Sequence, residues 1–553
     1  MSFFNPLKHE GILLEQMDLN KRLMLALVLS FVILFGFSYL FPQQHPAATD
    51  TNNSLSSQQQ AANPATTPAP LSQTNAAPTA APATSTPAST PTNAPAKAKK
   101  ALCTIQADTF TMTIDPFGRI NSTRLLEAKY HTEDGQVLEL FDPKQVKPLE
   151  IRFADARLNA EAFKVPYTVS TPALKLTHAP QSVTLTQKLM GLTVVKKLTF
   201  YPDGHYDLDV TMNKPVEYFI TPGHRPEADH ARYMLVRGAM IRDSKGVSTT
   251  IEDGKAEETV RVPDATILSA FDRYTASLFY TFEHPLPAVL TPEKNGNPLP
   301  FISAKGTIKL HGYIGPKEYR TLQKLDPQLT DAIEFGWFTF LSRPFFKVMV
   351  WIHDYVGNWG WAIVLFTLLV KLILFPLSYK GMMSMQKMKE LAPKMKELKE
   401  KHKGDPAKLN QQTMELYKKH GANPMGGCLP MLLQIPVFFA LYRVLLNADE
   451  LQGAPWIGWI TNLADKDPIY VLPLLMGLTM WLMQKVQPTT MGDAMQQKIM
   501  QWFPVIMTFF FLTFPAGLVL YWLTNNVLSI GQQTIINRAW ENQKAKVKSK
   551  KDT

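Results

Sequence analysis

One charged side chain lies in the middle of a long apolar stretch. Lys371 is near the centre of residues 360–379, which read GWAIVLFTLLVKLILFPLSY. A charge at the centre of a membrane helix costs roughly 2.5–3.5 kcal/mol on insertion. The twelve Leu, Ile, Val and Phe residues of the stretch offset this cost with about 4–7 kcal/mol. We therefore expect the stretch to insert into a membrane, with Lys371 facing a hydrated interior rather than lipid.

Other polar side chains also lie in apolar stretches, and several share a helix face. Thr367 precedes Lys371 by one helical turn. Polar residues at membrane depth are functional candidates by default, although they also form hydrogen bonds that only hold helices together. For Thr367, Gln434 and Asn525 both interpretations stay open. The candidate site residues are Lys371, Thr367, Gln434, Tyr521 and Asn525, and Gln532 shares a face with the last two.

The stretch that carries Lys371 is one of six predicted membrane spans. Residues 499–535 are too long for one span, and Phe514-Pro515-Ala516-Gly517 divides them into two helices. Residues 23–41 are longer than the apolar part of a secretory signal, which favours a retained anchor over a cleaved signal peptide. The predicted spans are residues 23–41, 360–379, 428–447, 468–486, 499–513 and 516–535.

Charges between the spans predict the topology. Residues 380–420 contain eleven lysines against five acids, whereas residues 448–467 contain four acids against one lysine. Because cytoplasmic loops of membrane proteins are rich in Lys and Arg, both termini are predicted to lie in the cytoplasm. Met17 begins the stretch MDLNKR and is a candidate for the true start of the chain. The predicted cytoplasmic segments are residues 1–22, 380–427 and 536–553.

The residues between the first two spans, 42–333, are predicted to lie outside. Residues 42–100 contain ten prolines but no glycine and no aromatic residue, so we expect a disordered linker that cannot bury a core. Residues 101–333 contain short alternating segments separated by turn signals such as Pro202-Asp203-Gly204. This pattern predicts a large antiparallel β-sandwich. The clearest predicted strands are residues 109–114, 183–189, 192–201 and 206–212.

Two amphipathic segments flank the span with Lys371. Residues 335–355 mix aromatic and charged side chains, which favours a helix lying in the membrane interface over a soluble core helix. Residues 380–427 predict a basic antiparallel helical hairpin, broken at Gly404-Asp405-Pro406. Its lysines in 380–420, together with the basic tail 538–553, are predicted to contact a ribosome, a targeting receptor or anionic lipid. The stripe Met388, Leu391, Met395 and Leu398 is typical of a packing seam.

The composition and the motifs exclude several classes of protein. Charged residues make up 19% of the 553 residues, below the roughly 25% of soluble domains. The two cysteines, Cys103 and Cys428, exclude a disulfide scaffold and a four-cysteine zinc site. The histidines have no metal-like spacing, and no nucleotide-binding motif is present. We therefore expect no catalysis, no metal and no cofactor.

A group of longer motifs resembles the YidC-type branch of the YidC/Oxa/Alb insertase family. The resemblance is dense over about residues 310–540 and looser before them. The motifs occur in the order of the family, which makes the resemblance specific. They are Trp351-Ile352-His353, Gly357-Asn358-Trp359-Gly360, Asn423-Pro424-Met425-Gly426-Gly427-Cys428-Leu429-Pro430, Gln434-Ile435-Pro436, Ala440-Leu441-Tyr442, Asp467-Pro468, Leu472-Pro473, Met495-Gln496-Gln497-Lys498-Ile499-Met500 and Phe514-Pro515-Ala516-Gly517-Leu518-Val519-Leu520-Tyr521.

The resemblance implies a bacterial inner-membrane insertase that helps membrane segments insert and fold, alone or with a Sec translocon. Its five C-terminal spans would enclose a hydrophilic groove, and Lys371 matches the position of the family's groove arginine. Thr367, Gln434, Tyr521 and Asn525 match positions of the groove or of substrate contact. The implied partners are nascent membrane proteins, the Sec translocon, a ribosome or targeting receptor, and membrane lipids; no cofactor is implied.

Two other functions are less consistent with the sequence. A secondary transporter or channel would use Lys371 as a substrate site, but such proteins usually contain internal repeats, and none is evident here. A purely structural membrane anchor for the β-domain would leave Lys371 and the polar residues around it unexplained. The sequence therefore favours the insertase.

Overall fold

The computed structural model describes most of the chain after residue 100. The chain divides into two compact units between Thr79 and Ala80, and all of the first unit lies outside the described residues. The predicted anchor 23–41, the linker 42–100 and Cys428 lie outside the described residues. The described residues are 101–131, 135–227, 236–335, 339–402, 405–421, 429–487 and 494–549.

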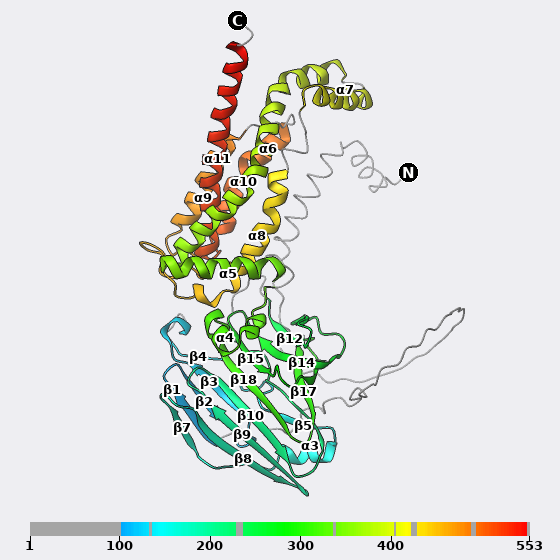
Figure 1. Ribbon diagram of the computed structural model, residues 1–553, viewed down its shortest axis with the longest axis vertical. Coiled ribbons are helices and arrows are strands. Elements are labelled where there is room, and N and C mark those ends of the chain that lie inside the picture. Colours follow the sequence, from blue (N-terminus) through cyan, green and yellow to red (C-terminus); the bar gives the residue numbers. More distant parts are fainter. Residues whose placement is uncertain are drawn as a thin grey trace, which may run out of the picture. The chain divides into compact units, whose positions relative to one another are not determined.

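The smaller sheet of the β-domain contains five strands within the described residues, in the order β4-β3-β2-β1-β7 (Figure 1). Alternate residues of β1 and β2 are buried, as expected for strands with one face against a core. All pairs in this sheet are antiparallel except β1 and β7, which are parallel. The strands are β1 (Cys103–Ala107), β2 (Phe110–Ile114), β3 (Ile120–Leu125), β4 (Leu138–Glu139) and β7 (Ala173–Leu176).

The larger sheet contains 13 strands within the described residues, and all its pairs are antiparallel. The four strands predicted from alternation are confirmed as β2, β8, β9 and β10. The prediction of an antiparallel β-domain is thus right, with the β1–β7 pair as its exception. The strands are β5 (Ile151–Phe153), β6 (Thr168–Val169), β8 (Gln181–Leu189), β9 (Leu192–Phe200), β10 (His205–Met212), β11 (Glu217–Ile220), β12 (Gly238–Asp243), β13 (Ser248–Glu252), β14 (Val260–Phe271), β15 (Thr275–Tyr280), β16 (Leu286–Pro292), β17 (Pro298–Lys305) and β18 (Ile308–Pro316).

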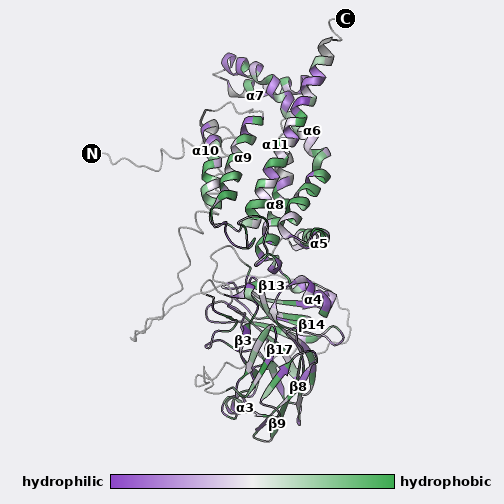
Figure 2. Cartoon of the chain, turned by 90° about the vertical axis from the view of Figure 1, so that its left-hand side faces the viewer, coloured by the Kyte–Doolittle hydropathy of each residue, from purple (hydrophilic) through white to green (hydrophobic). Residues whose placement is uncertain are grey.

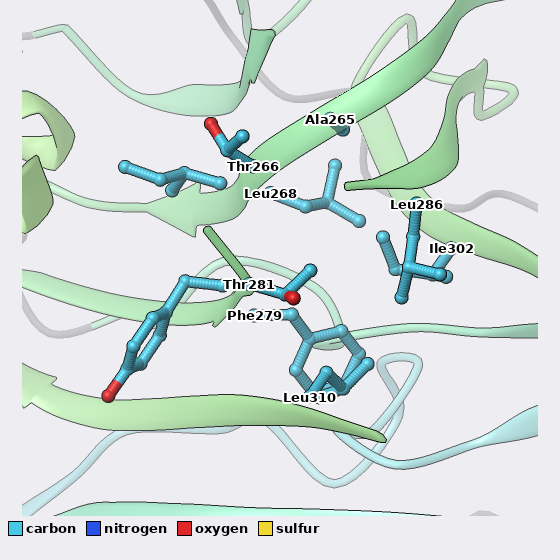
Figure 3. A pocket seen from close by; sticks show the side chains of 10 residues that line it. Ala265, Thr266, Leu268, Phe279, Thr281, Leu286, Ile302 and Leu310 are labelled. Atoms are coloured by element: carbon cyan, nitrogen blue, oxygen red, sulfur yellow. The ribbon is translucent and has the colours of Figure 1, made fainter. Parts of the chain in front are cut away.

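A small cavity lies inside the larger sheet, between strands β14 to β18 (Figure 3). Most of its lining is apolar, including Leu268, Phe279 and Ile302. Its polar lining side chains are Thr266, Tyr280 and Thr281, and no acid, histidine or lysine is among the residues that line it. The cavity therefore offers no pair of groups for acid–base catalysis.

The second half of the described chain is helical. Hydrophobic residues dominate α8, α9 and the first part of α11, whereas α7 and the end of α11 are more hydrophilic (Figure 2). Two short 3-10 helices connect the elements, η2 (Pro327–Ala332) and η5 (Asp449–Leu451). The α-helices of this half are α4 (Tyr319–Leu325), α5 (Thr339–Val356), α6 (Trp359–Lys401), α7 (Pro406–Lys419), α8 (Leu429–Asn447), α9 (Val471–Val486), α10 (Ala494–Phe511) and α11 (Ala516–Ser549).

Helix α6 is one continuous element of 43 residues. It contains both the predicted span 360–379 and the first arm of the predicted hairpin, so no helix boundary falls at residue 380. The reason is local, since residues 382–401 are mainly Met, Lys, Glu and Leu, which favour helix. Within the described residues, α6 is the helix that is long and apolar enough to cross a membrane, and Gln434–Asn447, Val471–Val486 and Met500–Phe511 are shorter apolar helices.

The predicted break before α11 is confirmed. Helix α10 ends at Phe511 and α11 begins at Ala516. The backbone N–H groups of Ala516 and Gly517 donate to the carbonyl oxygens of Asp465 and Leu463, at 2.6 and 2.9 Å. These bonds satisfy the free N-terminal amides of α11 and tie the turn to the loop between α8 and α9.

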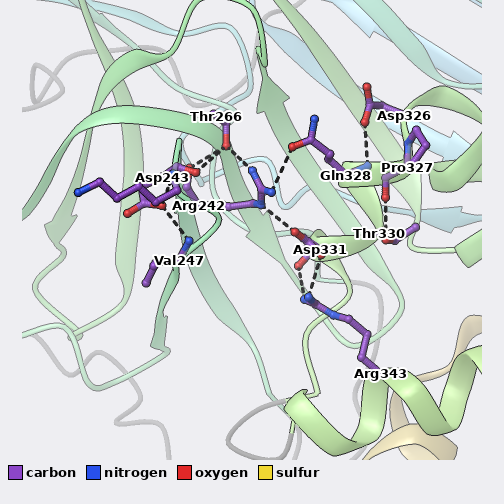
Figure 4. A network of polar contacts seen from close by, with 11 residues as sticks. Arg242, Asp243, Val247, Thr266, Asp326, Pro327, Gln328, Thr330, Asp331 and Arg343 are labelled. Atoms are coloured by element: carbon purple, nitrogen blue, oxygen red, sulfur yellow. Dashed lines mark hydrogen bonds and ion pairs between the residues drawn. The ribbon is translucent and has the colours of Figure 1, made fainter.

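Part of the β-domain shares a hydrophobic core with the helices, and the rest of the domain has a core of its own. The shared core joins side chains of β12, β14 and β15 to those of η2, α5 and α8, among them Met240, Leu329 and Phe346. Asp331 in η2 adds a polar link, because its carboxylate accepts hydrogen bonds from Arg242 of β12 at 2.7 Å and from Arg343 of α5 at 2.8 Å (Figure 4). The β-domain is therefore joined to α5 through side-chain packing as well as through the chain.

Candidate functional site

Lys371 of α6 contacts the last helix. Its Nζ donates a hydrogen bond to Oγ of Ser529 in α11 at 2.8 Å. The hydroxyl of Ser529 in turn donates to the carbonyl oxygen of Asn525 at 2.7 Å, which orients its lone pairs toward the ammonium group. Ser529 is 9% exposed, and Lys371 is partly buried. The ammonium group has three N–H donors, and Ser529 accepts one of them.

A second polar pair joins α8 to α11. Nε2 of Gln434 donates to the hydroxyl oxygen of Tyr521 at 3.0 Å. Tyr521 is 2% exposed. Tyr521 lies one turn before Asn525 on α11, so both pairs involve the same face of this helix. We call Lys371, Gln434, Tyr521, Asn525 and Ser529 the polar site.

Thr367 and Asn525 differ in their surroundings. Thr367 is 2% exposed, and its hydroxyl donates to the carbonyl oxygen of Ile363 in its own helix at 2.7 Å. It is therefore packed in the core, one turn from Lys371. In Asn525 the buried side-chain atom Oδ1 has no hydrogen-bond partner within the described part of the chain. The same is true of Nε2 of Gln532, whose side chain is 8% exposed.

Ser529 was not among the residues selected from the sequence, although its position on the helix gives a signal. Ser529 lies four residues after Asn525 and three before Gln532, so it completes the helix face on which those two residues were placed. Asn526 was also missed. Asn526 is 1% exposed. Its Nδ2 donates to the hydroxyl oxygen of Thr479 at 3.3 Å, and this bond joins α11 to α9.

Polar contacts also connect the helices near the predicted hairpin. Gln386 of α6 hydrogen-bonds Asn537 of α11, and Nε2 of Gln533 donates to the same Asn537 side chain at 2.8 Å. Nδ2 of Asn537 donates to the carbonyl oxygen of Val486 at 3.3 Å. In the predicted stripe, Leu391 is 4% exposed, whereas Met388, Met395 and Leu398 are half-buried.

The loop after α8 contacts the β-domain through two acids. Asp449 accepts a hydrogen bond from the hydroxyl of Tyr130 at 2.8 Å and lies 3.5 Å from Nζ of Lys129. Oε1 of Glu450 accepts the backbone N–H of Tyr319 at 2.6 Å. Burial raises the pKa of Asp449 to about 6 and that of Glu450 to about 8. The loop between α8 and α9 is therefore held against η1 (Ala128–Tyr130) and α4.

The described residues hold no group of three or more His, Cys, Asp or Glu side chains that is arranged to bind a metal ion. Cys103 is 1% exposed, and burial raises the pKa of its thiol to about 11. Its position in β1 is that of a packed core residue.

The fold and the polar site together define a class of protein, a membrane protein with a large β-rich domain and a polar interior among apolar helices. A family model described as "60Kd inner membrane protein" matches residues 351–544, and one described as "YidC periplasmic domain" matches residues 302–348. The chain is 45% identical to the "Membrane protein insertase YidC" of Campylobacter jejuni, over 94% of this chain and 96% of that protein. It is 44% identical to the protein of the same name from Helicobacter pylori, over 95% and 97% of the two chains.

The chain therefore belongs to the YidC family of membrane protein insertases, which are bacterial inner-membrane proteins with a periplasmic domain. Among solved structures, it is similar to one described as "Active YidC insertase crystal structure with the first transmembrane domain resolved". That similarity is 18% in sequence, with a TM-score of 0.34, over 78% of this chain and 94% of the other. The alternative of a transporter or channel finds no support in these relatives.

Proposed function

We propose that this chain inserts membrane segments of newly made proteins through a hydrated groove built around the polar site. The observation that carries this proposal is the hydrogen bond between Lys371 and Ser529, because it holds a positive charge among apolar helices. The relatives, named as membrane protein insertases, support the same function.

The positive charge lowers the barrier for the polar flank of a client. A flank that crosses the membrane loses its hydration, and this loss costs the most free energy for an ionised acidic side chain. Lys371 attracts such a side chain, and the attraction is stronger at low dielectric constant than in water. The ammonium group can donate to a carboxylate with the N–H groups that Ser529 does not accept.

The apolar part of a client can leave the site sideways. Leu372 and Ile373 follow Lys371 directly on α6 and are 61% and 67% exposed. Large exposed apolar side chains are favourable against lipid. These neighbours support a route from the polar site into the membrane, along which a client segment moves into lipid.

We also propose the number of spans and the side of the membrane on which each segment lies. Six spans, with residues 23–41 as the first, place both termini in the cytoplasm and residues 42–333 in the periplasm, as the distribution of lysines supports. Helix α5 lies in the membrane interface, supported by the exposed aromatic side chains of Phe340, Trp351 and Tyr355. The Sec translocon, a ribosome or targeting receptor, and membrane lipids are the proposed partners.

Insertion assays with purified protein in liposomes test the role of the charge. The clients carry one membrane segment and a flank with no, one or two acidic residues. Lys371→Ala should slow the acidic clients by about tenfold, since hydrogen bonds to charged groups contribute more than neutral ones, and it should leave the uncharged client nearly unchanged. Lys371→Arg should be tolerated because it keeps the charge.

Lys485→Ala is the matched control, because it removes a lysine from an exposed position at the end of α9. It should insert all clients at the wild-type rate. If Lys371→Ala also inserts every client at that rate, the charge has no role in insertion and the proposal is wrong.

A further inference from the structure

Three polar residues form a stripe along one face of α11. Asn525, Ser529 and Gln532 are separated by steps of four and three residues, so they lie one above another on the helix. At 1.5 Å per residue, the stripe is about 10 Å long. Ser529 at its middle holds Lys371. We call these three residues the polar stripe.

The two ends of the polar stripe carry side-chain amide atoms without partners. Oδ1 of Asn525 and Nε2 of Gln532 are buried, and neither has a hydrogen-bond partner among the residues that the structure describes. The side chain of Gln532 is more than nine-tenths buried. A buried polar atom without a partner is costly. One atom is an acceptor and the other is a donor, so a ligand must offer both kinds of group.

We propose that the polar stripe binds the main chain of an extended client polypeptide. Oδ1 of Asn525 accepts a hydrogen bond from a peptide N–H, and Nε2 of Gln532 donates one to a peptide carbonyl oxygen. An extended chain rises about 3.3 Å per residue, so the stripe covers about three residues. This inference rests on the proposed function and names what the site recognises besides acidic side chains.

The chemistry of the stripe fits a main chain better than side chains. Lys371 can select only for negative charge, which many flanks lack. Every residue except proline offers one N–H and one carbonyl group, whatever its side chain. A flank that leaves water must satisfy these groups before it reaches the other side. Neutral amides at both ends of the stripe serve this need for any client sequence.

The test compares two uncharged flanks on the same single-segment client. One flank consists of alanines, and in the other proline replaces alternate alanines and so removes peptide N–H donors. Wild-type protein in liposomes should insert the alanine flank faster. The double variant Asn525→Ala/Gln532→Ala should slow the alanine flank by about fivefold or more and remove the difference between the two flanks. Thr534→Val is the control, because its hydroxyl donates to the carbonyl oxygen of Ile530 in its own helix and to no other group in the described part of the chain.

Several outcomes would overturn the inference. An unchanged rate for the alanine flank would show that the stripe does not bind the main chain. Equal slowing of both flanks would show that the amides serve hydration or packing instead. Gln532→Met keeps the length of the side chain and adds no charge but removes the donor, so it should reproduce the loss if the double variant folds poorly. Failure of the proposed function can be distinguished from failure of this inference. In that case Lys371→Ala would leave the insertion rate of acidic clients unchanged.

Discussion

The bond between Lys371 and Ser529 is the central contact at the scale of single residues. Lysine is a compact point charge on a flexible stem, so its position depends on what holds the ammonium group. Ser529 does this with one lone pair, while its own proton is used on the carbonyl of Asn525. Removal of the hydroxyl should therefore leave the charge present but less well placed.

Ser529→Ala should weaken the preference for acidic flanks by about two- to tenfold, the range expected for one hydrogen bond. Ser529→Thr, which keeps the hydroxyl, should restore it. The measurement is the ratio of insertion rates for an acidic and an uncharged flank, in the wild-type and in the Lys371→Ala background. If Ser529→Ala has the same effect on this ratio in both backgrounds, the serine does not act through the lysine.

At the scale of elements, close helix packing positions the site. Helix α11 packs against α6, α8 and α9, and α9 packs in turn against α10. Gly477 of α9 allows the last of these contacts, because a Cβ there would overlap the side-chain oxygen of Thr508 in α10. Thr508 cannot easily turn away, since its hydroxyl donates to the carbonyl oxygen of Pro504 at 2.7 Å.

Gly477→Ala should therefore push α9 and α10 apart and cost about 1–3 kcal/mol of stability, as overpacking does in well-packed cores. The measurement is the Tm of the purified protein in detergent. Gly531→Ala in α11 is the matched control, since a Cβ there meets nothing within 4 Å. If both glycine variants melt together with the wild type, the α9–α10 contact is looser than the structure indicates.

At the scale of the second compact unit, residues 80–553, the β-domain packs against the helices and helps to position them. It shares a core with the helices, and Arg273 in the turn between β14 and β15 donates to the carbonyl oxygen of Leu446 at 2.5 Å. This bond places a positive charge at the C-terminal end of α8, where it is favourable. Asp449 and Glu450 follow at once and contact η1 and α4. The docking of the loop thus depends on two acids, of which Asp449 is buried and Glu450 is half-buried.

The stability of this docked state should fall as the pH rises. Burial raises the pKa of Glu450 from 4.5 to about 8, so the docked state binds more protons than the undocked state between these values. The stabilisation that the protonated Glu450 carboxyl gives the docked state is complete below pH 4.5 and is lost as the pH rises through about 8. Asp449, with its pKa near 6, acts in the same direction. Three buried lysines oppose them as the pH rises further, because the pKa of Lys196 is lowered to about 7 and those of Lys147 and Lys317 to about 8.

Thermal unfolding between about pH 5 and about pH 7, below the range in which the buried lysines act, measures this effect. Wild-type Tm should decrease over this range, and Glu450→Gln should flatten the decrease because its amide cannot ionise. Glu257→Gln, at an exposed position of the β-domain, should follow the wild type. A Glu450→Gln variant with the wild-type pH profile would contradict the role assigned to this acid.

Local patterns in the sequence determined which segments are strands and helices and which residues are candidates. The alternation of buried residues in β8 to β10, the break at Pro515 and the polar positions Lys371 and Asn525 all follow from the periods of strand and helix, which neighbouring residues set. The sequence also indicated the family, because motifs such as Phe514-Pro515-Ala516-Gly517 are contiguous.

The tertiary structure alone decided which of these faces meet. Lys371 and Ser529 are 158 residues apart, and the parallel pairing of β1 with β7 and the Asp331 bridge also join distant segments. Helix periodicity predicts that Asn525, Ser529 and Gln532 share a face, but it does not predict which helix that face contacts. That choice depends on the packing of whole side-chain surfaces against each other, which no local pattern contains.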